Sequence, residues 1–149
     1  MGIGFGRYKN RSAYCAVVAR VRVEEKIHVE EVWAVVDAGR VVNPDGLANQ
    51  IEGGIIQSLS WTLKEAVTWS EIGITSQTWD SYPILTFAEV PEVHVVLLDR
   101  SAEPSLGSGE AAAGPTAAAV GNAVAHALGI RARHLPLTAE RLTQLINDA

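Results

Sequence analysis

The sequence predicts an α+β fold. A β-hairpin and a further strand form a mixed sheet, which packs against a long helix containing Gly53-Gly54 and against two C-terminal helices. Two observations predict this arrangement. β-Branched residues crowd positions 12–37, whereas apolar residues recur every four positions from 47 to 63. A strand-like apolar run at 93–99 and an alanine-rich run at 115–128 then repeat the change from strand to helix patterning.

The first part of the chain predicts the hairpin. Its two β-rich runs, Ser12–Val23 and Ile27–Asp37, are joined by the polar residues Glu24-Glu25-Lys26, a connection that favours an antiparallel pair. Apolar residues alternate in only part of each run, so we expect one buried face and one half-covered face. Gly2–Arg7 is expected to be a glycine-rich lead-in to the first strand. It is not a dinucleotide-binding fingerprint, because no predicted strand precedes it and no helical pattern follows it.

A long helix is predicted from about Pro44 to Thr68. Asn43 can cap its N-terminus and Pro44 suits the first helical position. Its apolar stripe consists of Leu47, Ile51, Ile55, Leu59 and Leu63. Gly53-Gly54 in its middle costs about 1 kcal/mol per glycine relative to alanine. The pair lets another backbone or a ligand come close, and close helix–sheet packing is the commoner of these explanations.

Turn-forming residues and two further apolar patterns mark the rest of the chain. Ser70–Val90 predicts a long loop with a short extended piece around Tyr82-Pro83-Ile84-Leu85, and such loops often are functional or pack against a partner. A buried strand is predicted at Val93–Asp99. Helices are predicted at Pro115–Leu128 and Thr138–Asn147, and Thr138 caps the second of them.

The candidate site lies in the glycine loop Leu106-Gly107-Ser108-Gly109-Glu110, between the last strand and the next helix. Two glycines let the backbone bend sharply and approach a ligand closely. Glu110 is flanked almost entirely by Gly, Ser and Ala. Partial burial would suit such a carboxylate to the role of general base. The alternative is a solvated glutamate that complements the dipole of the following helix.

Composition excludes several classes of protein. With 149 residues, a hydrophobic fraction of 48% and a charged fraction of 19%, the chain is expected to form one globular domain over residues 1–149. A net charge of −5 without a basic cluster argues against nucleic acid as the main partner. No apolar run is long enough to span a bilayer. The absence of a signal-peptide hydrophobic region favours the cytoplasm, or the periplasm through a partner chain.

Metal-binding and nucleophilic side chains are sparse. Cys15 is the single cysteine, which excludes an internal disulfide and a cysteine-built metal cluster. The four histidines are scattered without metal-ligand spacing, so no metal ligand is assigned. Ser108 lacks the nucleophile-elbow pattern around it, which argues against a serine hydrolase.

Two stretches, taken together and in order, resemble a known family. They are Val36-Asp37-Ala38-Gly39-Arg40-Val41-Val42-Asn43-Pro44-Asp45, continued by Asn49-Gln50-Ile51-Glu52-Gly53-Gly54-Ile55-Ile56-Gln57-Ser58-Leu59-Ser60, and Leu106-Gly107-Ser108-Gly109-Glu110. They closely resemble the C-terminal part of the molybdopterin-binding large subunit of the xanthine dehydrogenase/aldehyde oxidoreductase family. The branch with isoquinoline, nicotinate and aldehyde dehydrogenases looks nearest. Arg7-Tyr8-Lys9-Asn10 and Asp80-Ser81-Tyr82-Pro83-Ile84 are similar to further landmarks of that family.

The resemblance implies an oxidoreductase that hydroxylates aldehydes or N-heteroaromatic carbons with oxygen taken from water. It also implies a molybdenum–molybdopterin cofactor. A glutamate in the family's Gly-x-Gly-Glu motif removes the proton from the attacking hydroxyl, and Glu110 matches this glutamate. Gln50 matches a position that hydrogen-bonds the cofactor near the metal. The backbone N–H groups of Gly107, Ser108 and Gly109 would point toward the same centre.

Large subunits of this family are several times longer than this chain. We therefore expect a separately encoded piece of a split subunit or a truncated fragment, which is inactive alone and shares the cofactor with a partner chain. The implied partners are the remainder of the molybdopterin-binding subunit and an iron–sulfur subunit. Without them the chain is expected to expose apolar surface and to self-associate. The alternative is a non-catalytic binding or assembly module, or an inactive fragment, with the same fold.

Overall fold

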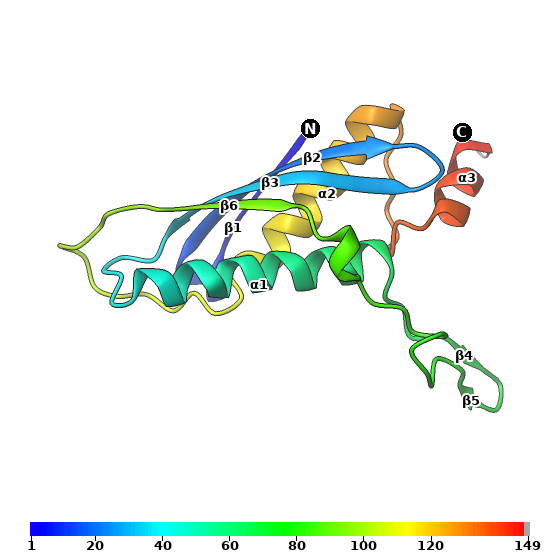
Figure 1. Cartoon of the computed structure of the whole chain (residues 1–149), viewed down its shortest axis with the longest axis horizontal. Coiled ribbons are helices and arrows are strands. Elements are labelled where there is room, and N and C mark those ends of the chain that lie inside the picture. Colours follow the sequence, from blue (N-terminus) through cyan, green and yellow to red (C-terminus); the bar gives the residue numbers. More distant parts are fainter. Residues whose placement is uncertain (148–149) are drawn as a thin grey trace.

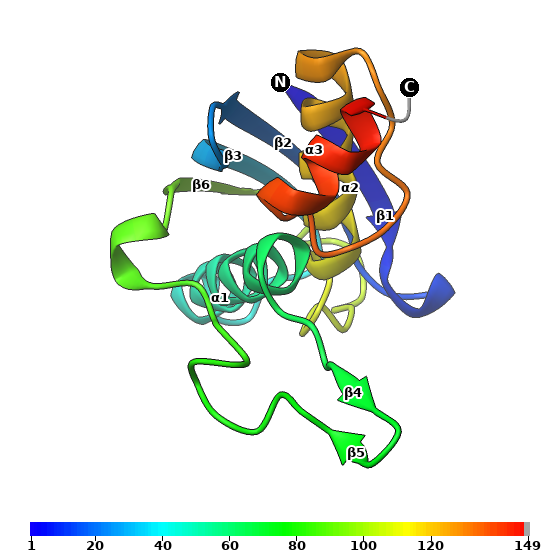
Figure 2. The same cartoon turned by 90° about the vertical axis from the view of Figure 1, so that its right-hand side faces the viewer.

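The computed structural model describes residues 1–147, which form six strands, two short 3-10 helices and three α-helices (Figures 1 and 2). The strands are β1 (Gly2–Arg7), β2 (Tyr14–Val23), β3 (Ile27–Asp37), β4 (Trp69–Ser70), β5 (Gly73–Ile74) and β6 (Glu92–Leu97). The helices are η1 (Tyr8–Asn10), α1 (Pro44–Leu63), η2 (Phe87–Glu89), α2 (Ala113–Leu128) and α3 (Ala139–Asn147).

Four strands form one mixed sheet, in the order β1-β2-β3-β6. The β1–β2 and β2–β3 pairs are antiparallel, and β3 and β6 are parallel. Helices α1 and α2 cover one face of this sheet (Figures 1 and 2). The core between these layers contains Cys15, Val17, Val32, Ala34, Ile51, Ile55, Leu59, Val120 and Val124, all at most 1% exposed. The predicted α+β fold, with its hairpin and mixed sheet, is confirmed.

Strand β1 corrects the expectation of a glycine-rich lead-in. Its inward-facing positions Gly2, Gly4 and Gly6 let helix α2 lie directly on the strand backbone. A Cβ atom at Gly4 would lie 2.0 Å from the carbonyl oxygen of Pro115, and one at Gly2 would lie 2.2 Å from the backbone nitrogen of Ala123. The sequence concealed the strand because glycines supply no apolar alternation, although they are what permits the close contact.

The predicted helices form, with shifted ends. Asn43 caps α1 as predicted, since its side chain accepts a hydrogen bond from the Gly46 N–H at 3.0 Å. Helix α1 ends at Leu63 rather than Thr68, and the Ser60 carbonyl accepts the N–H groups of both Lys64 and Glu65 at that end. Helix α2 begins at Ala113, two residues before the predicted start. Within residues 1–147, none of the helices combines the length and the apolar character that a membrane span requires.

The sheet face opposite the helices is open and carries both apolar and charged side chains. Its exposed large apolar side chains include Phe5 (67% exposed), Ile3 (60%), Val96 (54%), Val35 (39%) and Tyr14 (36%). The Phe5 and Tyr14 rings stack at 6.1 Å. The half-covered face expected for the hairpin is therefore present. The exposed apolar side chains that were expected are also found on this face.

The segment between α1 and η2 forms an arm, which projects from the body of the molecule and carries the β4–β5 hairpin (Figures 1 and 2). The long loop predicted over Ser70–Val90 thus contains the hairpin and η2. The hairpin region is exposed and rich in large apolar side chains, including Trp69 (76% exposed), Ile72 (98%) and Trp79 (75%). These side chains have little to pack against within the described chain, so the arm adds a second exposed apolar surface.

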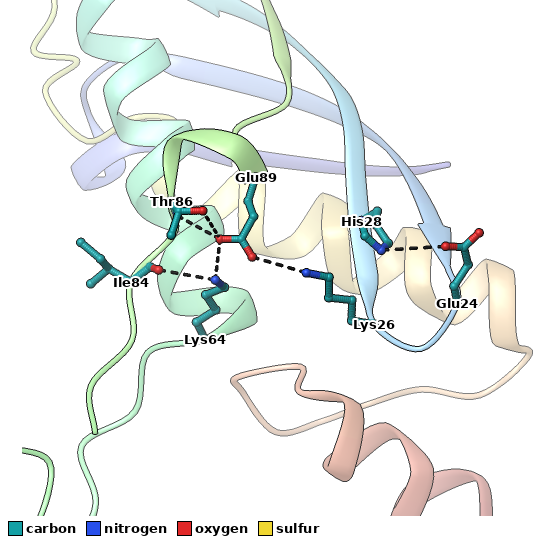
Figure 3. A network of polar contacts seen from close by, with 7 residues as sticks. All are labelled: Glu24, Lys26, His28, Lys64, Ile84, Thr86 and Glu89. Carbon is teal, nitrogen blue, oxygen red and sulfur yellow. Dashed lines mark hydrogen bonds and ion pairs between the residues drawn. The ribbon is translucent and has the colours of Figure 1, made fainter. Parts of the chain in front are cut away.

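The base of the arm is fastened by a polar network around Glu89 (Figure 3). The Glu89 carboxylate accepts hydrogen bonds from the Thr86 backbone N–H at 3.0 Å and hydroxyl at 2.7 Å, and it pairs with the Lys64 ammonium at 2.5 Å. Desolvation alone would raise the pKa of Glu89, but the hydrogen bonds from Lys64 and Thr86 outweigh it and lower the pKa to about 2. Glu89 therefore favours its ionised form in the folded chain.

Low pH is expected to destabilise the contacts that hold the arm to the body of the molecule. The pKa of Glu89 falls from 4.5 to about 2 on folding, so the stabilisation is present above pH 4.5 and is lost as the pH falls toward 2. Since the side chain is 26% exposed, its contribution is roughly 2 kcal/mol after allowance for solvent screening. Glu89→Gln should remove the pH dependence of this stabilisation. Hydrogen exchange at the Leu85 amide, which donates to the Ser60 hydroxyl, measures it. Glu71→Gln, at the exposed tip of the arm, is the matched control. An unchanged exchange profile in Glu89→Gln would contradict this role.

Candidate functional site

The glycine loop and the start of α2 are held by three hydrogen bonds, two from α1 and one from the residue before β2. The Gln50 side chain, from the first half of α1, donates to the Gly109 carbonyl at 2.7 Å. The Ala13 N–H, just before β2, donates to the Gly107 carbonyl at 3.1 Å. Ser58, further along α1, donates its hydroxyl to the Ala113 carbonyl at 2.7 Å. These bonds fix the loop against α1 and the sheet, and they bring Gln50 and the loop together across 59 residues of sequence.

A cavity of about 410 Å³ lies between α1 and this loop. We call it the Glu110 cavity; it is lined by Asn49, Gln50, Gly53, Gly54, Gln57, Trp61, Gly109, Glu110 and Ala113. The lining residues of α1 recur at helical spacing and therefore share one face of the helix. That face is exposed at Gln50, Gly53 and Gln57, whereas the face with Ile51 and Ile55 is buried in the core.

The glycines of this cavity are not required by packing within the chain. A Cβ atom at Gly53 or Gly109 would have no neighbour within 4 Å, and one at Gly54 would meet only the Ala112 methyl at 3.8 Å. Close helix–sheet packing, the commoner explanation for Gly53-Gly54, is therefore wrong at Gly53. The missing side chains widen the cavity instead, which leaves the approach of a ligand or of another chain as the reason for the pair.

Glu110 lies at the rim of the cavity, at the turn that leads into α2. Its carbonyl accepts the Ala113 N–H at 3.2 Å, and its carboxylate accepts the Tyr8 hydroxyl at 2.9 Å. Within residues 1–147, no cation lies at ion-pair distance from this carboxylate. Glu110 is exposed in this chain, which agrees with the alternative of a solvated glutamate, and residues 1–147 do not provide the partial burial that would suit a general base. The walls that could bury the carboxylate would have to come from outside the described residues.

A second cavity, of about 260 Å³, adjoins the first and shares Gln50 and Gly109 with it. We call it the Arg40 cavity; its lining includes Arg40, Asn43, Gly46, Leu106 and Ser108. Ser108 thus faces this neighbouring space rather than the Glu110 cavity. Gly107 is not among the described residues that line either cavity, and its carbonyl is used in the bond from Ala13.

Sequence reasoning did not assign Tyr8, Gln57, Trp61 or Arg40 to the site. Tyr8 had a signal, because it belongs to the stretch Arg7–Asn10 that resembles a family landmark. Gln57 and Trp61 follow Gly53 at helical spacing and could have been found from that spacing alone. Among residues 1–147, no group of three His, Cys, Asp or Glu side chains is arranged to hold a metal ion.

The comparisons with known proteins agree with this architecture. The family model described as a molybdopterin cofactor-binding domain matches residues 4–91, which include Gln50 but not Glu110. The chain is 48% identical over 142 residues to a nicotinate dehydrogenase subunit of Pseudomonas putida, with 93% of this chain and 12% of that protein covered. It is 34% identical over 140 residues to the beta subunit of isoquinoline 1-oxidoreductase from Brevundimonas diminuta, with 92% and 18% covered.

Solved structures give the same picture. Quinoline 2-oxidoreductase from Pseudomonas putida 86 superimposes with a TM-score of 0.81 at 30% identity, over 91% of this chain and 19% of that one. The aldehyde oxidoreductase from Desulfovibrio desulfuricans gives a TM-score of 0.79 at 26% identity, over 89% and 15%. The chain belongs to the molybdopterin cofactor-binding domain family, which is represented in the molybdopterin-binding subunits of xanthine dehydrogenase-type oxidoreductases. It spans less than a fifth of the length of these relatives.

Proposed function

We propose that this chain forms one wall of the active site of a molybdenum hydroxylase and supplies its catalytic base, Glu110. The observation that carries the proposal is the meeting of Gln50 and Glu110 on one glycine-lined cavity. Gln50 would hydrogen-bond the cofactor, and Glu110 would take a proton from the hydroxyl that adds to the substrate carbon. The other wall and the rest of the cofactor site would come from the remainder of the molybdopterin-binding subunit.

The residues present fit a molybdopterin cofactor. Gly53 and Gly109 leave space where any other residue would place a side chain. The Gln50 amide uses one N–H on the Gly109 carbonyl, and its oxygen and second N–H remain available within the described residues. When bound, the molybdenum group would supply the oxygen and accept the electrons. This chain would orient the group through Gln50 and the backbone N–H groups of Ser108 and Gly109, with Gly107 holding the loop in place.

The base role of Glu110 is supported by its position. The carboxylate stands at the cavity rim, ahead of the N-terminus of α2. A carboxylate in this position could accept a proton from a hydroxyl held in the cavity. Once a partner covers the rim, exclusion of water would strengthen the interaction between this carboxylate and a bound substrate.

An N-heteroaromatic carbon is the favoured substrate over an aldehyde. Three of the relatives are named for nicotinate, isoquinoline and quinoline, and the first is the most similar of the proteins compared above. Trp61 gives the Glu110 cavity an aromatic side chain, against which a planar ring could stack. An iron–sulfur subunit would then carry the electrons away.

Purification with and without the partner tests this function. Purified alone, the chain is expected to hold no molybdenum and to self-associate through its open sheet face and arm, which expose large apolar side chains. Purified with the remainder of the subunit, it is expected to hold molybdenum and to form a defined complex. Size-exclusion chromatography with metal analysis measures both. An isolated chain that is monomeric at high concentration, or an assembled complex free of molybdenum, would contradict the proposal.

A further inference from the structure

The Glu110 carboxylate has one hydrogen-bond partner from a distant part of the chain. The Tyr8 hydroxyl donates to Oε2 of Glu110 at 2.9 Å, across 102 residues of sequence. Tyr8 comes from η1, the short turn between β1 and β2. Its half-buried ring packs against the hydrophobic core, so the hydroxyl is presented from a fixed ring rather than from a mobile side chain.

The turn that carries Tyr8 is joined to the glycine loop through its backbone. The Tyr8 N–H donates to the Ala13 carbonyl at 2.8 Å, and the Ser12 N–H donates back to the Tyr8 carbonyl at 2.9 Å. Ala13 in turn donates its N–H to Gly107. Lys9 and Asn10 hold φ values of 47° and 59°, a left-handed conformation that is uncommon for lysine and commoner for asparagine. The two loops therefore act as one unit.

The hydrogen bond leaves the two oxygens of Glu110 unequal. An exposed glutamate samples several rotamers, and the Tyr8 hydroxyl selects those in which Oε2 points to η1. Oε1 has no hydrogen-bond partner among residues 1–147, and Glu110 is one of the residues that line the Glu110 cavity. Tyr8 itself is not among the described residues that line this cavity, so it can act on a ligand only through Glu110.

We infer that Tyr8 is a positioning residue, which orients Glu110 so that Oε1 is the oxygen that accepts the proton from the reacting hydroxyl. The inference rests on the proposed base role of Glu110. It predicts that loss of the Tyr8 hydroxyl slows proton transfer without weakening substrate binding. A misplaced catalytic group costs up to about 10²-fold in rate, so Tyr8→Phe should lower kcat of the assembled enzyme by about 10- to 100-fold with KM nearly unchanged.

The matched control is Tyr82→Phe. The Tyr82 hydroxyl donates to Oε2 of Glu65 at 2.8 Å, so this variant also removes a tyrosine–carboxylate hydrogen bond, but in the arm. It should leave kcat unchanged. If Glu110→Gln is inactive but Tyr8→Phe behaves like Tyr82→Phe, the positioning role is wrong while the base role stands. If Glu110→Gln retains activity, the base role itself is wrong.

A second readout needs neither metal nor a Tyr8 variant. In the 149-residue chain, the ¹³C resonance of the Tyr8 Cζ atom should move as acid protonates the Glu110 carboxylate. In Glu110→Gln, this response to acid should be absent. The Cζ resonance of Tyr82 should respond to acid in both proteins, because its partner Glu65 is retained. A Tyr8 resonance that responds identically with and without Glu110 would overturn the inference, whatever the enzyme's activity.

Discussion

In the assembled enzyme, Glu110→Gln is expected to abolish turnover while leaving the molybdenum content intact. Glutamine keeps the size of the side chain and can still accept the Tyr8 hydrogen bond, but it cannot take up the proton. A general base contributes about 10²- to 10⁴-fold to rate, so the loss should be at least of that order. Turnover and molybdenum per chain, measured side by side on the reconstituted complex, are the two quantities needed.

Gln50→Ala provides the contrast. Because its partner in the proposal is the cofactor, this variant should lose molybdenum as well as slow the reaction. It also removes the bond to the Gly109 carbonyl, so the glycine loop should become more mobile. Near-normal activity in Glu110→Gln, or loss of molybdenum as its main defect, would show that Glu110 is not the base.

Gly4→Ala is expected to destabilise the fold severely. The new methyl group would lie 2.0 Å from the Pro115 carbonyl oxygen and 2.8 Å from the Ala119 backbone nitrogen, and neither can move without shifting α2. Overpacking of this kind costs about 1–3 kcal/mol, and more where backbone must yield. A loss of at least about 3 kcal/mol should lower Tm by roughly 10 °C in a thermal unfolding experiment.

Gly121→Ala is the matched control on the same helix. Its added methyl group would meet nothing within 4 Å, so the variant should gain up to about 1 kcal/mol from helix propensity. Since α2 follows directly from the glycine loop, Gly4→Ala should also disturb Glu110, which links the packing of β1 to the site. Equal stability of the two variants would mean that α2 does not lie on β1 as described.

Apolar periodicity was sufficient to predict the hairpin, the long helix and both C-terminal helices. It failed at β1, because Gly2, Gly4 and Gly6 carry no side chain from which alternation could be recognised. It also failed at the end of α1, because the change from helix to arm depends on contacts of Ser60 with the returning chain. Long-range contacts of this kind leave no local pattern.

The site was predictable in its parts but not in its arrangement. Glu110 was recognised from its glycine loop and its uncharged neighbours, whereas Gln50 was chosen only because its motif resembles that of a family, and spacing alone would not have paired the two. The hydrogen bonds from Gln50 to Gly109 and from Tyr8 to Glu110 join positions 59 and 102 residues apart. The sequence left open whether Glu110 is partly buried or solvated, because burial depends on which distant residues pack around it; among residues 1–147 none covers it.

The most direct test of whether the cofactor binds in the Glu110 cavity is the molybdenum content of the Gly53→Leu variant. A side chain at this position meets no described residue within 4 Å of its Cβ, so the variant should fold with undiminished stability while its leucine fills the cavity. Gly121→Leu, the same change on α2 with equal free space around its Cβ, is the control. Reconstituted with the partner chain, Gly53→Leu should bind far less molybdenum than Gly121→Leu. Equal molybdenum in the two complexes would contradict the assignment of this cavity.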